Sequence, residues 1–212
     1  YEITCRDLSS DVCSSDLYMS LLGDDWDLGQ LFSFSYFHNL WALVLGVKNY
    51  SLDGLSLGAE YVHASHWMYT HWTGNNYTNW DTHLGHTIDP NSHLFSVDAS
   101  WDASPGLNFG FTGRFGQHGR GDVDTPADWG AEAALYGVSL GDLFYSFLDA
   151  GVLDIPVETF WDATLSVSAQ VRALRSVPVT VEAGWTLSRT LNRGNVAGAD
   201  FWDNYFSLAV RL

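Results

Sequence analysis

Residues 160–174, with the sequence FWDATLSVSAQVRAL, decide the fold class of this chain. Apolar side chains alternate with polar ones throughout, from Trp161 beside Asp162 to Val171 beside Arg172. A period of two held this long predicts one β-strand with an apolar face and a polar face. Strands in soluble proteins usually have about 3–10 residues. The length therefore favours a strand that crosses a membrane, with a large soluble β-sandwich as the alternative.

The same alternation recurs along the chain, and repetition makes a signal that is weak in any one segment usable. Regular segments lie at residues 95–103, 107–115, 177–187 and 205–212, and less regular ones at residues 31–38, 41–49 and 55–67. We expect about eight strands from Asp24 onward. The turn Ser104-Pro105-Gly106 joins two of them as a hairpin. The fold predicted is an all-β, antiparallel, up-and-down transmembrane β-barrel.

The lengths of the connections give an independent indication. Short connections are expected at residues 52–54, 104–106 and 174–178, and long ones at residues 70–92, 117–159 and 189–200. Outer-membrane barrels have short periplasmic turns and long extracellular loops, so every short turn falls on one side. Residues 131–140 and 143–148 are either two more strands or part of a folded extracellular loop.

Composition restricts the function classes. The chain is 46% hydrophobic and 15% aromatic, with a formal net charge of −16. No apolar run reaches the roughly 18 residues of a membrane helix, so a membrane location requires a closed sheet. Nine Lys and Arg residues are too few for nucleic-acid binding. We expect a protein of the Gram-negative outer membrane, with lipid, lipopolysaccharide and the barrel-insertion machinery as partners. Charged residues in the polar rows then face a wet lumen: Asp98, Asp102, Arg114, Arg172 and Glu182.

The first residues differ in character from the rest. Both cysteines, Cys5 and Cys13, lie there, and residues 6–17, RDLSSDVCSSDL, resemble the translation of a common sequencing-library adapter. We expect residues 1–17 to be non-native and residues 18–212 to form the barrel domain. The natural protein would then continue upstream, and these strands would be the C-terminal part of a larger barrel.

Residues 60–91 carry the most distinctive motifs. In order they are Glu60-Tyr61, Tyr69-Thr70-His71, an Asn-Tyr-rich stretch, Leu84-Gly85-His86 and Pro90-Asn91. Their order and spacing resemble the capsule assembly Wzi family of outer-membrane proteins. The resemblance implies a large barrel that acts as a surface lectin and holds or organises capsular polysaccharide.

This segment has the side chains that sugar binding uses. Aromatic rings stack on apolar sugar faces, and amide, carboxylate and imidazole groups bond to hydroxyls. The candidate carbohydrate-binding residues are Trp67, Tyr69, His71, Trp72, Asn76, Tyr77, Asn79, Trp80, Asp81 and His86. Each aromatic residue taken singly fits interface and loop packing equally well.

Other activities are less well supported by the residues. Six histidines lie between His63 and His93, but His63 and His66 are three apart and would point to opposite faces of a strand. We therefore expect no metal site and no cofactor. An outer-membrane acyl hydrolase would need a Ser–His pair, and neighbours such as Ser65-His66 or Ser92-His93 diverge on a strand. No catalytic residue is expected, and a passive porin with an open lumen is the other alternative.

Overall fold

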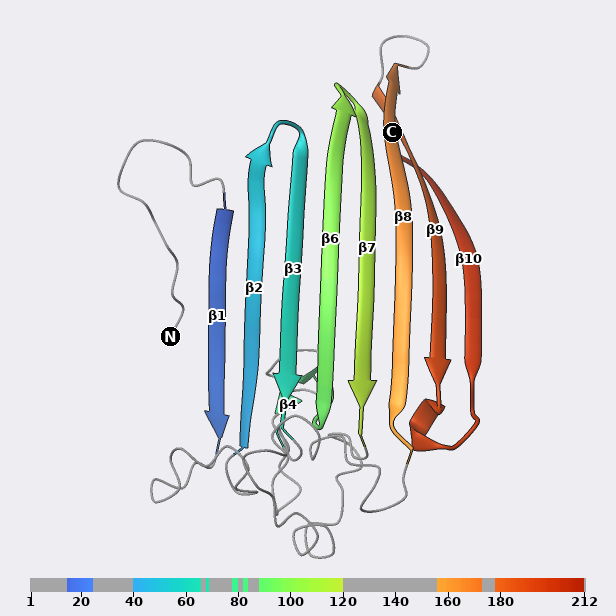
Figure 1. The fold of residues 1–212 in the computed structure, drawn as a ribbon. Helices are drawn as coiled ribbons and strands as arrows, with labels where there is room; N and C mark the ends of the chain where they lie inside the picture. The colour runs from blue at the N-terminus through green and yellow to red at the C-terminus, as the bar shows by residue number, and fades with distance from the viewer. Residues whose placement is uncertain are drawn as a thin grey trace, which may run out of the picture.

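The chain folds as one large antiparallel sheet (Figure 1). The computed structural model describes residues 15–24, 40–65, 68, 78–79, 82–83, 88–119, 156–172 and 178–211. Eight strands pair in the order β1-β2-β3-β6-β7-β8-β9-β10. Their bounds are β1 Ser15–Asp24, β2 Leu40–Leu52, β3 Leu55–Ala64, β6 Ser92–Ser104, β7 Leu107–His118, β8 Glu158–Arg172, β9 Pro178–Leu191 and β10 Phe201–Arg211. The all-β, up-and-down prediction is confirmed for these residues.

Three minor elements complete the described chain. β4 (Thr78–Asn79) and β5 (Thr82–His83) form a separate two-stranded sheet. η4 (Arg193–Asn195) is a short 3-10 turn between β9 and β10. Within the described residues, no helix has the length and hydropathy needed to span a membrane.

Several predicted strand limits differ from the observed ones, and β10 begins at Phe201 rather than at Tyr205. Ser15–Asp24 was not predicted as a strand, yet it is β1, and it includes three residues of the adapter-like segment. β3 was predicted to reach Trp67 but ends at Ala64. The strands proposed at residues 31–38, 131–140 and 143–148 lie outside the described residues.

The two ends of the sheet differ in their connections (Figure 1). Asp53 and Gly54 join β2 to β3, and Pro105 and Gly106 join β6 to β7. Both glycines have positive φ, 70° at Gly54 and 84° at Gly106, which residues with a Cβ rarely adopt. β8 and β9 are also connected at this end, which we call the turn end. The long connections, residues 65–91, 119–157 and 192–200, start and finish at the opposite end, which we call the loop end.

The pairing register separates one apolar face from one polar face. Residues directly opposite in an antiparallel pair share a face, so each row of partners can be followed across the sheet. Within the described ranges, all exposed large apolar side chains lie on the apolar face except Tyr50, Val196, Phe201 and Tyr205. Those on the apolar face are Leu17, Met19, Leu21, Leu45, Val47, Leu57, Phe95, Trp101, Phe109, Phe111, Phe115, Leu165, Trp185, Trp202, Phe206, Leu208 and Val210.

The sheet is open. β1 pairs only with β2, and β10 pairs only with β9, so each presents one unpaired edge within the described chain. Unpaired edges are rare in stable sheets unless they are covered or protected. The architecture observed is therefore an open eight-stranded sheet rather than a closed barrel.

Candidate functional site

Ser65 links the strands at the loop end. Its N–H donates to the Trp41 carbonyl (2.9 Å), and its Oγ accepts from the Trp41 N–H (2.9 Å). Its carbonyl accepts from the N–H groups of Met68 (3.1 Å) and Asn91 (3.0 Å). The Asn91 carbonyl in turn accepts from the Gly119 N–H at 2.9 Å. These bonds join β2, β3, β6 and β7 where the long connections begin, and we call this set the loop base.

The loop base is buried. Ser65, Met68 and Asn91 are each at most 3% exposed, and Pro90 and Gly119 are buried as well. Asn91 has φ of 57°, a left-handed conformation that Asn tolerates better than most residues. The chain therefore leaves the sheet after Ser65 and returns to it at Asn91, and both residues are buried and hydrogen-bonded to each other.

Four rings form a cluster beside the loop base on the apolar face. The ring centroids of Trp41 and His63 lie 4.4 Å apart, and those of His63 and His93 lie 4.5 Å apart. His63 and His93 are direct partners in the β3–β6 register. The hydroxyl of Tyr61 bonds to Nδ1 of His93. Sequence spacing alone missed this pair, because it depends on how two strands separated by a long connection align.

The family-motif residues are only partly described. Glu60 and Tyr61 are adjacent on β3 and point to opposite faces, and Pro90 and Asn91 lie in the loop base. The structure thus brings the two ends of the motif together at one end of the sheet. The middle of the motif lies outside the described residues: Tyr69, Thr70, His71, Leu84, Gly85 and His86.

The candidate sugar-binding residues stay predictions. Asn79 lies in β4, where its backbone pairs with Thr82 of β5. The others lie outside the described residues: Trp67, Tyr69, His71, Trp72, Asn76, Tyr77, Trp80, Asp81 and His86. What the structure adds is the position of the two ends of their segment, both at the loop end.

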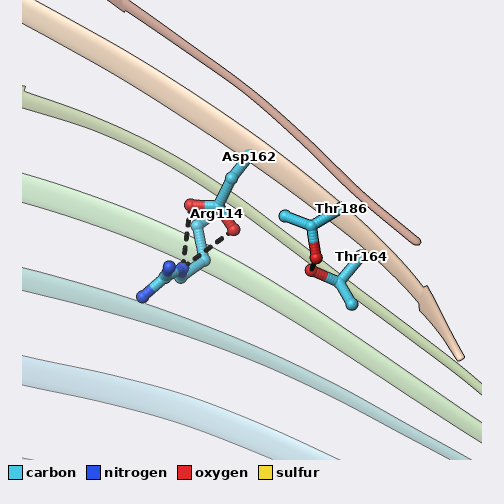
Figure 2. Close-up of polar contacts among 4 residues, drawn as sticks. All are labelled: Arg114, Asp162, Thr164 and Thr186. Carbon is cyan, nitrogen blue, oxygen red and sulfur yellow. Dashed lines mark hydrogen bonds and ion pairs between the residues drawn. The ribbon is translucent and has the colours of Figure 1, made fainter. Parts of the chain in front are cut away.

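Polar contacts cross the strands on the polar face. Figure 2 shows Arg114 of β7 and Asp162 of β8 pointing toward each other, with Nε donating to both carboxylate oxygens at 3.0 Å. The hydroxyls of Thr164 and Thr186 are 2.9 Å apart, on β8 and β9 (Figure 2). Arg211 pairs with Glu182 at 3.0 Å between Nη2 and Oε2. Because Arg114 and Arg211 are largely exposed, these ion pairs add little stability.

The polar face carries more acids than bases. Among the residues whose side chains the structure describes, its acidic residues are Asp16, Glu60, Asp98, Asp102, Glu158, Asp162, Glu182 and Asp203, and its basic residues are Lys48, Arg114 and Arg211. Of the row charges named in the sequence, Asp98, Asp102, Arg114 and Glu182 do share one face. A face of this composition is suited to contact with water and cations.

Ser92 and His93 do not form the Ser–His pair that an acyl hydrolase would need. Ser92 Oγ donates to the Pro90 carbonyl (3.3 Å), whereas the His93 ring bonds to Tyr61 on the opposite face. No group of three or more His, Cys, Asp or Glu side chains that could hold a metal ion occurs in the described part of the chain.

Comparison of the chain with protein-family models, with curated proteins and with solved structures finds no match.

Proposed function

We propose that this sheet is part of a closed β-barrel in the bacterial outer membrane. The observation that carries the proposal is the segregation of exposed apolar side chains on one face across all eight strands. Soluble proteins rarely expose a continuous apolar patch larger than a few hundred Å². In a bilayer this face would contact lipid, and the polar face would line an aqueous lumen. The backbone N–H and C=O groups would be hydrogen-bonded between neighbouring strands.

Additional strands would close the barrel. The row that begins at Tyr18 of β1 ends at Asp203 of β10, and relative to this row β1 and β10 are offset by four residues at the loop end and five at the turn end. A barrel strand tilt of about 35–45° requires an offset of roughly eight residues or more between the edges of eight strands. β1 has 10 residues and β10 has 11. The observed offset is smaller than this, so direct closure would leave part of each edge unpaired, which favours a barrel with more strands than these eight.

The role that we propose for this barrel is to hold or organise capsular polysaccharide at the cell surface. It rests on the motif resemblance of residues 60–91 and on the hydrogen bond between Ser65 and Asn91, which brings the two ends of the connection within this motif together at the loop base. In outer-membrane barrels the end with long connections is extracellular. The aromatic and amide-rich segment would then begin and end on the side where capsule lies.

Loss of the protein is expected to release capsule from cells. In a strain lacking the gene, capsular polysaccharide should move from the cell-associated fraction to the medium, and the wild-type gene should restore it. A Trp72→Ala, Tyr77→Ala double variant should bind purified capsular polysaccharide about tenfold more weakly, about 1.4 kcal/mol, because two ring contacts of about 0.5–1.5 kcal/mol are lost. Glycan binding by isothermal titration measures this.

The matched control is Trp129→Ala, which removes an aromatic residue from a different long connection. This variant should bind the polysaccharide as the wild type does. Unchanged capsule retention in the deletion strain would contradict the capsule role while leaving the membrane barrel intact as a hypothesis.

A passive pore is the second candidate, and the acidic polar face favours it. If this face lines an open lumen, vesicles with inserted protein should pass small cations more readily than small anions, since acidic groups outnumber basic ones there. Reversal-potential measurements across a salt gradient test this. Exchanging Asp98 and Asp102 for Asn should reduce the preference. The absence of conductance in bilayers with inserted protein would reject the pore.

A further inference from the structure

Arg189 is the only Asp, Glu, Lys or Arg residue on the apolar face of the described strands. It lies two residues before β9 ends at the loop end. Its register partners are Trp161 on β8 and Trp202 on β10. A lone charge on an otherwise apolar face is expensive in lipid and becomes tolerable only near the membrane surface. Its position at the rim therefore calls for a specific explanation.

Aromatic rings surround this arginine. Cζ of Arg189 is 5.9 Å from the ring centroid of Trp202, within cation–π range. The rings of Trp202 and Trp161 meet edge to face with centroids 5.5 Å apart. Tryptophan collects at membrane–water interfaces, where one part of the ring is apolar and the other meets water. The arginine and its two tryptophans thus have the composition of an interfacial site.

A second arginine lies in the adjoining turn. Arg193 of η4 has its Cζ 5.4 Å from the ring centroid of Phe201, the first residue of β10. Its backbone N–H donates to the Ala199 carbonyl at 2.9 Å. Phe201 pairs with Thr190 on the polar face, so Arg193 adds a second positive charge to this rim without joining Arg189 on the apolar face, on a chain whose formal net charge is −16.

The turn that carries Arg193 is held in place by its asparagines. Asn195 Nδ2 donates to the carbonyls of His118 and Pro156, both at 3.0 Å. Asn192 Nδ2 donates to the Val157 carbonyl at 3.1 Å. These bonds tie the β9–β10 connection to the ends of β7 and β8. A fixed turn lowers the entropy cost of binding a ligand between its side chains.

Asp200 is the acidic neighbour of the site, and it leaves the arginine available. Its Oδ2 lies 3.9 Å from Arg189 Nη2, and both side chains are nearly half exposed. Exposed pairs at this distance contribute little. Asp200 Oδ1 also accepts from the Asn192 N–H at 3.2 Å. With five N–H donors on each guanidinium, Arg189 and Arg193 retain the capacity to bind an anion.

From this arrangement we infer that Arg189, with Trp161 and Trp202, binds a phosphate group of lipopolysaccharide in the outer leaflet, and that Arg193 adds positive charge at the same rim. The inference rests on the proposed membrane barrel. Guanidinium matches phosphate oxygens bidentately, and the exposed residues Phe206 and Leu208 follow Trp202 along the apolar face of β10, where acyl chains would lie. The ligand class is a phosphorylated glycolipid, in which guanidinium binds phosphate and the apolar face contacts the acyl chains.

The test measures binding of fluorescent lipopolysaccharide to the full chain in detergent micelles by anisotropy. An Arg189→Ala, Arg193→Ala double variant should bind about tenfold more weakly or worse, because the charge-assisted contact of Arg189 and the neighbouring charge of Arg193 are both lost. Arg211→Ala is the matched control, since Arg211 is exposed on the polar face, and it should bind as the wild type does. Unchanged binding by the double variant overturns the inference.

Two competitors identify the source of the phosphate. Unlabelled lipopolysaccharide should displace the probe, whereas its dephosphorylated form and inorganic phosphate should displace it poorly. Equal competition by the dephosphorylated form shows that acyl chains alone are recognised and overturns the inference. Full competition by inorganic phosphate shows an anion site without lipid recognition and overturns it as well.

The same preparations separate this inference from the proposed barrel. Wild type and double variant are added to phospholipid vesicles, and insertion is measured by protection from protease. If neither inserts, both the barrel and the lipid site are rejected. If both insert equally and bind lipopolysaccharide equally, only the lipid site is rejected. Equal insertion with weakened lipopolysaccharide binding in the variant supports both.

Discussion

Replacing Leu165 with arginine is expected to prevent the chain from inserting into bilayers. Leu165 lies midway along β8 on the apolar face, half exposed, between Phe111 of β7 and Trp185 of β9. Arginine facing lipid near the midplane of a barrel costs about 2–4 kcal/mol, a large fraction of the roughly 5–15 kcal/mol that stabilises a typical protein. The measurement is the fraction of protein that resists protease after folding into phosphatidylcholine vesicles.

Ser166→Arg is the matched control, one residue further along the same strand. Ser166 points to the polar face, where its register partners are Gly110 and Gly184, which leave room for a long side chain. It should insert nearly as well as the wild type. In a soluble sheet with an exposed apolar face, Leu165→Arg would cost little, because the new charge would meet water. Equal insertion of the two variants would therefore reject the assignment of the apolar face to lipid.

The alternation of faces was predictable because it is a local property. Side chains on a strand alternate with a period of two whatever the strand pairs with, so Trp161 and Asp162 could be assigned to opposite faces before any partner was known. The tight turn at Pro105-Gly106 then fixes how β6 and β7 align, and a slip by one residue would exchange their faces. Hairpins with recognisable turns are therefore the best-predicted part of the fold.

The end of β3 was mispredicted because a side-chain hydrogen bond, made by Ser65, ends the strand. The pattern of apolar residues continues to Trp67, but at Ser65 the hydroxyl takes the place of the carbonyl as acceptor for the Trp41 N–H. The freed carbonyl accepts instead from Met68 and Asn91. Ser side chains commonly compete with the ladder in this way. The competition depends on groups from other strands, which the local pattern does not contain.

β1 was missed for a different reason. Leu22 lies on the polar face opposite Ala42, so the alternation in Ser15–Asp24 is imperfect, and the strand begins inside the adapter-like segment. The contact between His63 and His93, and the position of Arg189 as the lone charge on the apolar face of the described strands, could be recognised only from the full strand register. The first joins strands on either side of a long connection, and the second becomes visible only when the faces of all eight strands are known.

Gly46→Val is expected to destabilise the sheet, although valine is ordinarily favoured over glycine in strands. A Cβ at Gly46 would meet the ring of Tyr18, which crosses β2 to donate its hydroxyl to Glu60 Oε2 on β3 at 2.8 Å. Valine would displace the ring and break that bond. Overpacking of this kind costs about 1–3 kcal/mol, measured as a lower midpoint of urea unfolding with an unchanged slope.

The sign of this effect should reverse when the ring is removed. In a Tyr18→Ala background, Gly46→Val meets no ring, so strand propensity alone acts and the substitution should be neutral or stabilising. The double-mutant cycle should therefore give a coupling of about 0.5–3 kcal/mol. Because Tyr18 lies just after the adapter-like residues, the cycle also tests the pairing of β1 with β2. Additive effects of the two substitutions would mean that Tyr18 does not lie over Gly46, and β1 would have to be removed from the sheet.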